Sequence, residues 1–211
     1  MRALSFEHYG RQTYGIRDAS GVREASAVFR QQFPDLRAVI AAGMLERLPS
    51  NCIRDALAEE AVTFLPTIPR PSRIICVGVN YRPHVEEMGR EIPEKPVLFV
   101  RFPGSLVGHG QPLVRPRASG QFDFEGELAI VIGRRARHVA PADAARYIAG
   151  YTGFMDGSVR DWQRHTPQFT PGKNFDMSGA MGPYLVTPDE AGPLAELPIE
   201  TRVNGEVMQQ A

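Results

Sequence analysis

Glycine and proline interrupt this chain so often that long regular elements have little room. The sequence holds 20 glycines and 18 prolines in 211 residues, about 18% of the chain against an average usage of about 12%. Proline breaks helix interiors and central strands, and glycine weakens both. The pattern therefore disfavours a helical bundle or a coiled coil and favours short strands joined by many turns.

The hydrophobic pattern predicts an α+β fold that is mostly β. Short alternating or apolar runs bounded by turn residues are typical of strands. Such runs occur at Ala3–Phe6, Gln12–Arg17, Val22–Ala25, Ile74–Val79, Val97–Arg101, Glu127–Ile132, Tyr184–Thr187 and Ile199–Val203. Helical patterns occur at Leu36–Leu48, Asp55–Val62, His84–Met88 and Pro141–Ala149. Asp35 is the expected N-cap of the first of these helices, and Asn204-Gly205 is typical of a hairpin turn.

A proline cluster divides the chain into two unequal parts. Pro66, Pro69 and Pro71 fall within six residues, which favours a linker there. A chain of 211 residues suits one domain, or one domain with a small appendage. We therefore expect a small N-terminal α/β domain at residues 1–68 and a larger, catalytic domain at residues 69–211.

Charge and composition exclude several classes of protein. Lys and Arg total 24 and Asp and Glu total 24, so the formal net charge is zero and no basic patch favours nucleic acid. Apolar runs such as Leu128–Ile132 fall far short of the ~18 residues of a membrane span, and the start of the chain lacks a signal-like apolar stretch. Cys52 and Cys76 form no disulfide framework. We expect a cytoplasmic protein with no nucleic-acid or membrane partner.

The segment Phe122–Ile132 places acidic side chains on one face of a predicted strand. Because successive side chains point to opposite faces, Asp123, Glu125 and Glu127 share a face. Carboxylates that close repel one another, and a hard divalent cation would offset the repulsion through oxygen ligands. The alternative is the solvated face of an edge strand.

A second polar group follows an apolar stretch at Asp156. Gly153 and Gly157 flank this aspartate, which suits a carboxylate at the end of a strand. Arg160 and Gln163 are three residues apart, so one helical turn would bring them together. The alternative is a helix-capping aspartate followed by surface polar residues.

Two further features are typical of catalytic sites. His84 and Glu87 would share a face of a short helix, where a carboxylate can orient a histidine that acts as a general base. Lys173 lies in a turn-rich segment and, with Lys95, is one of only two lysines among 24 basic residues. Lysine, unlike arginine, has a pKa that its surroundings can tune. The alternatives are a surface histidine and a solvated loop lysine.

Taken in order, these segments resemble the fumarylacetoacetate hydrolase family. The resemblance runs from about Ile74 to Ala211. Its motifs are Cys76-Val-Gly-Val-Asn-Tyr with His84-x-x-Glu87, then Glu125-x-Glu127, Asp156 with Arg160-Asp-Trp-Gln163, Gly172-Lys173, and Val203-Asn-Gly-Glu. It is similar to the acylpyruvase and 2-hydroxyhepta-2,4-diene-1,7-dioate isomerase members, and the first 68 residues resemble the small N-terminal domain of many bacterial members.

The resemblance implies a mixed β-sandwich roll, a homodimer and a metal-dependent site. It assigns Mg²⁺ or Mn²⁺ to Glu125, Glu127 and Asp156, catalysis to His84, Glu87 and Lys173, and substrate binding to Arg160 and Gln163. In the family, the metal chelates the carboxylate and keto oxygen of a 2-oxo acid, and the His-Glu pair activates water from a mobile lid. The lysine helps to hold the substrate or its enolate.

We therefore expect a metal-dependent hydrolase that cleaves a C–C bond in acylpyruvate-type 2-oxo acids through an enolate, which a bound cation stabilises. One alternative is an oxaloacetate decarboxylase, or an isomerase or hydratase of 2-oxo acids from aromatic degradation. Another is a non-catalytic remnant, since the family's C-terminal section is not seen before Ala211. Arg101 stands where many members have lysine, a difference expected to alter substrate contacts.

Overall fold

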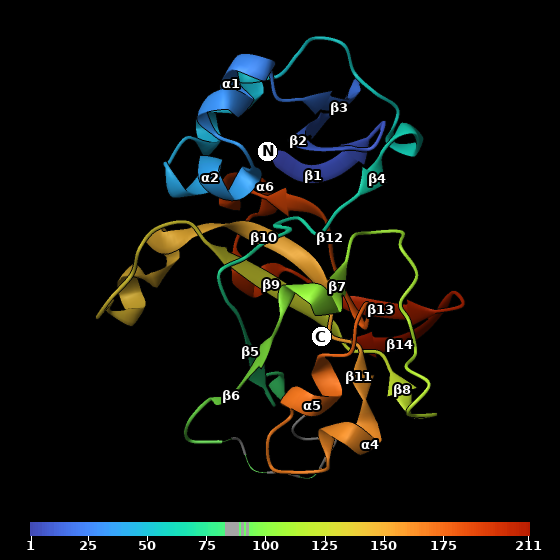
Figure 1. The fold of residues 1–211 in the computed structure, drawn as a ribbon. Coiled ribbons are helices and arrows are strands. Elements are labelled where there is room, and N and C mark those ends of the chain that lie inside the picture. Colours follow the sequence, from blue (N-terminus) through green and yellow to red (C-terminus); the bar gives the residue numbers. More distant parts are fainter. Residues whose placement is uncertain (83–88, 90, 92) are drawn as a thin grey trace.

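A mixed sheet of eight strands forms the centre of the molecule. The computed structural model describes residues 1–82, 89, 91 and 93–211. The strands follow the order β3-β2-β1-β12-β10-β9, with β4 added beside β1 and β7 beside β12 (Figure 1). Their bounds are β1 Arg2–His8, β2 Arg11–Asp18, β3 Gly21–Glu24, β4 Thr63–Phe64, β7 Leu106–Val107, β9 Gly126–Ile132, β10 Ile148–Met155 and β12 Gly179–Val186. The β7–β12 pair is parallel.

Three two-stranded sheets and short helices complete the fold. The pairs are β5 Ile74–Gly78 with β6 Val97–Arg101, β8 Phe122–Asp123 with β11 Ser158–Val159, and β13 Glu200–Val203 with β14 Glu206–Gln210. The α-helices are α1 Ala27–Gln32, α2 Leu36–Ala41, α4 Arg160–Gln163, α5 Thr170–Lys173 and α6 Pro188–Ala191. The 3₁₀ helices are η1 Leu45–Arg47, η2 Pro49–Asn51, η3 Glu59–Ala61, η4 Pro103–Ser105, η5 Pro141–Tyr147 and η6 Leu194–Glu196. Within the described ranges, no helix has the length and apolar character needed to cross a membrane.

The sheet and the main core continue across the proline cluster. β1 pairs with β2 and β4 and also, antiparallel, with β12. The cluster itself is held in place, since Leu65 N donates to Ser5 O at 3.0 Å and Ser5 Oγ donates to Thr67 O at 2.9 Å. One buried core includes Leu36 of α2 and Leu185 of β12. A separate domain at residues 1–68 stays a prediction.

The helix predicted over Leu36–Leu48 is correct at its start and wrong at its end. Asp35 Oδ1 accepts a hydrogen bond from Ala38 N at 2.7 Å, as an N-cap does. The helix ends at Ala41 because Gly43 adopts a φ of 67°. The amide of Gly43 then donates to Ile40 O and that of Met44 to Val39 O, which together form a Schellman motif. The hydrophobic pattern continues to Leu48, but the helix does not, because Gly43 takes the left-handed conformation two residues after Ala41.

Several other predictions can be compared with the structure. Asn204 and Gly205 have φ values of 52° and 88° and join β13 to β14, so the predicted hairpin is confirmed. The predicted strand run Glu127–Ile132 is confirmed as part of β9. Its extension back to Phe122 as one strand is wrong, because the chain leaves β8 after Asp123 and enters β9 at Gly126. Of Pro141–Ala149, residues Pro141–Tyr147 form a 3₁₀ helix. The predicted helix His84–Met88 lies outside the described residues.

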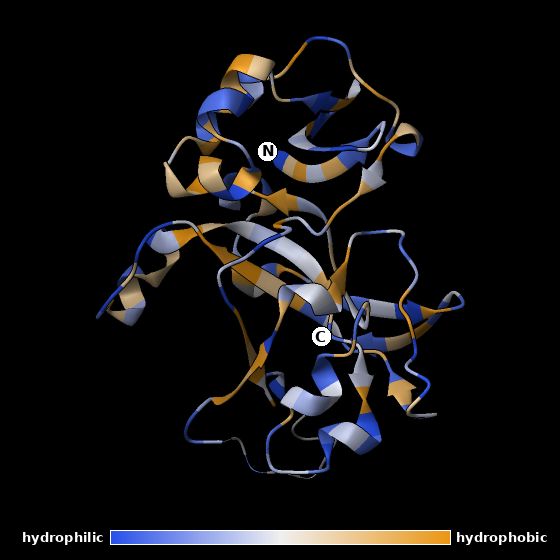
Figure 2. Ribbon diagram, in the orientation of Figure 1, coloured by the Kyte–Doolittle hydropathy of each residue, from blue (hydrophilic) through white to orange (hydrophobic). Residues whose placement is uncertain are grey.

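The β5–β6 pair has an inner and an outer face. Cys76 is opposite Phe99 in the register of the two strands, and Phe99 and Arg101 are buried. The alternate positions are apolar but exposed, so the outer face of this pair carries hydrophobic side chains (Figure 2). These are Ile75, Val77, Leu98 and Val100. The inner face lines the cavity described next.

Candidate metal and substrate site

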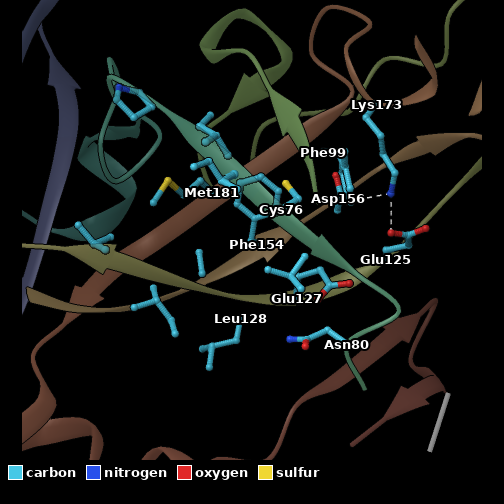
Figure 3. Close-up of a pocket in the computed structure, with 18 of the residues that line it drawn as sticks. Cys76, Asn80, Phe99, Glu125, Glu127, Leu128, Phe154, Asp156, Lys173 and Met181 are labelled. Carbon is cyan, nitrogen blue, oxygen red and sulfur yellow. Dashed lines mark hydrogen bonds and ion pairs between the residues drawn. The ribbon is translucent and has the colours of Figure 1, made fainter. Parts of the chain in front are cut away.

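An open cavity of about 1860 Å³ lies among β5, β9, β10 and the two short helices α4 and α5. Its polar end contains Glu125, Glu127, Asp156 and Lys173, and Phe154 and Met181 form an apolar wall beside it (Figure 3). Arg160 and Gln163 also line it. Six of the eight side chains predicted for the site thus line one cavity, although their chemical roles stay predictions. The other two, His84 and Glu87, lie outside the described residues.

Lys173 is the centre of the polar end. Its side chain is 1% exposed, and its Nζ donates to Glu125 Oε2 at 2.6 Å and to Asp156 Oδ2 at 2.7 Å (Figure 3). The ammonium also lies 5.1 Å from the centre of the Phe99 ring. A buried lysine paired with two carboxylates is not a solvated loop residue, so that alternative is wrong.

Local structure places Asp156 beside this lysine. The strand β10 ends at Met155, as predicted for a carboxylate at a strand end, and the Asp156 amide then donates to Glu125 O at 2.8 Å. Glu125 lies in the break between β8 and β9, and this hydrogen bond holds it beside Asp156 at the end of β10. Asp156 is 3% exposed, which excludes the alternative of a surface capping residue.

The α4 helix brings Arg160 and Gln163 together, as their spacing predicted. Arg160 Nη1 donates to Gln163 Oε1 at 2.9 Å and also to Glu125 Oε1. Arg160 Nε donates to Asp123 Oδ2 at 2.9 Å. Glu125 therefore lies between two cations, Lys173 and Arg160, and both of its carboxylate oxygens accept hydrogen bonds.

The surroundings of Glu127 raise the pKa of its carboxyl group. Burial, followed by the nearby charges of Glu125 and Asp156, raises its pKa from 4.5 to about 7, although a hydrogen bond with Tyr81 and the charge of Lys173 oppose the shift. The same burial raises the pKa of Tyr81 to about 12. A positive charge added beside Glu127 would therefore favour its ionised form.

The sequence analysis named Arg101 as a departure expected to alter substrate contacts but did not place it beside Asp156. Arg101, at the end of β6, donates from Nη1 to Asp156 Oδ1 at 2.6 Å, on the opposite side of that carboxylate from Lys173. It is not among the residues that line the cavity. Its contacts are thus with the protein rather than with the space for a substrate. A signal was present, since strand alternation places Arg101 on the same face as the buried Phe99.

The donor set has the chemistry of a site for a hard divalent cation. Glu125, Glu127 and Asp156 offer carboxylate oxygens, which Mg²⁺ and Mn²⁺ prefer, and a positive charge already lies between two of them. As the side chains lie, no three potential metal ligands in the described ranges are grouped closely enough to hold an ion. Cation binding would therefore require these side chains to turn toward it.

Known proteins are similar to this chain in sequence. The family model for the fumarylacetoacetate hydrolase C-terminal region matches residues 73–211. The human protein "Oxaloacetate tautomerase FAHD2A, mitochondrial" is 42% identical over 155 residues, which are 72% of this chain and 49% of the relative. The chain thus spans about half the length of the curated relatives that it matches.

Solved structures share the fold over the whole chain. A fumarylacetoacetate hydrolase from psychrophilic Exiguobacterium antarcticum is 34% identical with a TM-score of 0.81, and the match covers 100% of this chain and 75% of that one. A 2-hydroxyhepta-2,4-diene-1,7-dioate isomerase from Mycobacterium marinum is 30% identical with a TM-score of 0.76, and the match covers 100% and 74%. The predicted mostly β, α+β roll is confirmed. The chain belongs to the fumarylacetoacetate hydrolase family.

Proposed function

We propose that the chain catalyses the interconversion of the keto and enol forms of a 2-oxo acid, with Mg²⁺ or Mn²⁺ held by Glu125, Glu127 and Asp156. The observation that carries the proposal is the buried ammonium of Lys173 between two carboxylates at the polar end of the cavity. The names of the relatives, a tautomerase and an isomerase, denote reactions that move a proton and a double bond without loss of a fragment.

The residues of the site have distinct tasks in this reaction. Removal of a proton next to a keto group places negative charge on the keto oxygen, and a bound divalent cation supplies Lewis-acid stabilisation of that charge. Lys173 Nζ donates hydrogen bonds at the same end of the cavity and offers a second positive group for this oxygen. Arg160 and Gln163 present polar groups for the substrate carboxylate. His84 stays the predicted base for the proton.

The hydrolysis of acylpyruvates expected from the sequence stays a second prediction. It requires activated water, a task assigned to His84 and Glu87, which lie outside the described residues. The decarboxylation of oxaloacetate is a third outcome of the same chemistry. Dimerisation of the chain and a cytoplasmic location also stay predictions.

A product assay separates these reactions. The purified chain with Mn²⁺ is given oxaloacetate, and the loss of enol absorbance is followed together with release of CO2; a parallel assay measures pyruvate released from an acylpyruvate. We expect the enol to disappear faster with the chain than with Mn²⁺ alone, and we expect no release of CO2. Lys173→Met should reduce the rate about 100-fold or more, the effect of removing one donor to a developing oxyanion. Lys95→Met, at the other, exposed lysine, should leave it unchanged.

Absence of catalysis, hydrolysis or decarboxylation would each contradict the proposal. Enol loss no faster than with Mn²⁺ alone would exclude catalysis of tautomerisation. Pyruvate or CO2 release as the main reaction would replace it with hydrolysis or decarboxylation. Each variant is assayed below its own melting temperature, so that loss of activity does not reflect unfolding.

A further inference from the structure

Arg101 is the most completely enclosed charged side chain beside the site. Its side chain is 0% exposed, and the Asp156 side chain that it contacts is 4% exposed. Arg101 Nη1 donates to Asp156 Oδ1 at 2.6 Å and to Gly157 O at 3.0 Å. A buried guanidinium is costly to desolvate unless it is fully paired, so such an arrangement needs a compensating network.

That network accounts for every N–H of the guanidinium. Nη2 donates to Ser178 Oγ at 2.8 Å and to Ser105 O at 3.5 Å, and Nε donates to Ser105 Oγ at 3.2 Å. The acceptors come from the segments that follow β6 and β10 and precede β12. An arginine offers five donors in a rigid planar fork, whereas lysine offers three on a flexible stem. The guanidinium is therefore held in a single orientation.

The backbone around Arg101 leaves room for this group. A Cβ on Gly179 would lie 2.6 Å from Arg101 Nη2 and 2.8 Å from Cζ, so the first residue of β12 must be glycine for the guanidinium to fit. The enclosure by β12 thus fixes the position of Arg101, and Arg101 fixes one oxygen of Asp156.

We propose that Arg101 is a positioning residue that holds Oδ1 of Asp156 in the protein and leaves only Oδ2 to face the cavity. This inference rests on the proposed function, because its consequence is that Asp156 ligates a cation through Oδ2 alone. Oδ2 is the oxygen that now accepts from Lys173. Partners of this kind, which orient a ligand from behind, change metal affinity about 10- to 100-fold when they are removed.

The test measures Mn²⁺ affinity and stability separately in the full chain. Free Mn²⁺ is counted by electron paramagnetic resonance, and melting temperatures are taken in chelator. Arg101→Met should weaken Mn²⁺ binding about 10- to 100-fold. If the guanidinium acted through its charge alone, its removal would instead tighten cation binding. Arg101→Lys, which keeps the charge but not the fork, should weaken binding by a smaller factor.

Ser5→Ala is the matched control for stability. It removes a buried hydroxyl hydrogen bond in the N-terminal part of the sheet, far from the cavity in sequence, and should lower the melting temperature without changing Mn²⁺ affinity. The inference is overturned if Arg101→Met binds Mn²⁺ as tightly as the native chain or more tightly. If that variant does not fold, the inference is overturned if Arg101→Lys binds Mn²⁺ with native affinity. A native chain that binds no Mn²⁺ overturns the proposed function and this inference together.

Discussion

Lys173 pairs with two carboxylates in the metal-free protein, the buried Asp156 and the half-buried Glu125. Replacement by methionine keeps the volume of the side chain but leaves Glu125 and Asp156 without the ammonium. Removing one partner of a buried ion pair costs about 3–5 kcal/mol when the remaining charge has no other partner. Arg101 and Arg160 lower this cost here, because they still pair with Asp156 and Glu125. We expect Lys173→Met in chelator to lose no more than that free energy of unfolding and to melt at a lower temperature, measured by circular dichroism. Lys95→Met, at an exposed lysine, should stay within about 0.5 kcal/mol of native.

Glu127 should make the metal-free protein less stable as pH rises. Burial raises its pKa in the folded state to about 7, above the ordinary value of 4.5. The folded chain therefore keeps a proton that the unfolded chain releases, so the contribution of this group is fully present below pH 4.5 and is lost as pH rises through about 7.

Glu127→Gln isolates this effect from other titrating groups. Melting temperatures of native chain and variant are measured in chelator across the same pH range. The native curve should fall relative to that of the variant between pH 4.5 and about 7. Parallel curves would show that Glu127 keeps an ordinary pKa in the folded chain.

At the scale of elements, the contact between α4 and α5 places Lys173. A Cβ on Gly172 would lie 2.5 Å from the backbone nitrogen of Gln163, so the two short helices approach this closely only with glycine there. The backbone of α4 cannot move away from this Cβ as easily as a flexible side chain could. We expect Gly172→Ala to push α5 away from α4 at a cost of about 1–3 kcal/mol, the usual range for overpacking, and to weaken Mn²⁺ binding.

Gly120 provides the comparison for this substitution. No heavy atom lies within 4 Å of a Cβ built on it, and its φ is not in the left-handed region. Gly120→Ala should therefore change the melting temperature little, as surface substitutions do. Equal melting temperatures and Mn²⁺ affinities in the two variants would show that the α4–α5 approach does not depend on glycine.

At the scale of the whole molecule, one core joins the N-terminal elements to the site. Leu36 of α2 and Leu185 of β12 are both fully buried in the same cluster, and β1 pairs with β12 in the central sheet. The single tryptophan, Trp162, lies in α4 beside the site. Its fluorescence therefore reports unfolding at a point remote in sequence from α2.

Leu36→Ala tests whether the molecule unfolds as one unit. Removing a fully buried leucine side chain costs about 2–5 kcal/mol. In a cooperative molecule, the transition seen by Trp162 fluorescence should fall in temperature together with that seen by circular dichroism. A Trp162 transition that stays at its native temperature would show that residues 1–68 unfold as an independent domain.

Sequence patterns predicted much of the local structure because nearby residues decide it. The N-cap at Asp35 depends on an amide three residues away, and the hairpin at Asn204-Gly205 depends on two residues that tolerate positive φ. The early end of α2 was also open to prediction from Gly43, whose left-handed conformation terminates the helix. The order of short motifs along the chain indicated the family, which the comparisons confirm.

Tertiary structure alone decided which charges meet. Asp156 and Ser178 lie 55 and 77 residues from Arg101 along the chain, and the three come together only through the pairing of the sheets. The raised pKa of Glu127 likewise requires burial and the charge of Asp156, which comes from another segment, in addition to that of nearby Glu125. The sequence by itself thus determined the residues that could form a site. The sheet order decided how they pair, since Coulomb and desolvation energies depend on distances in space and not on spacing in the chain.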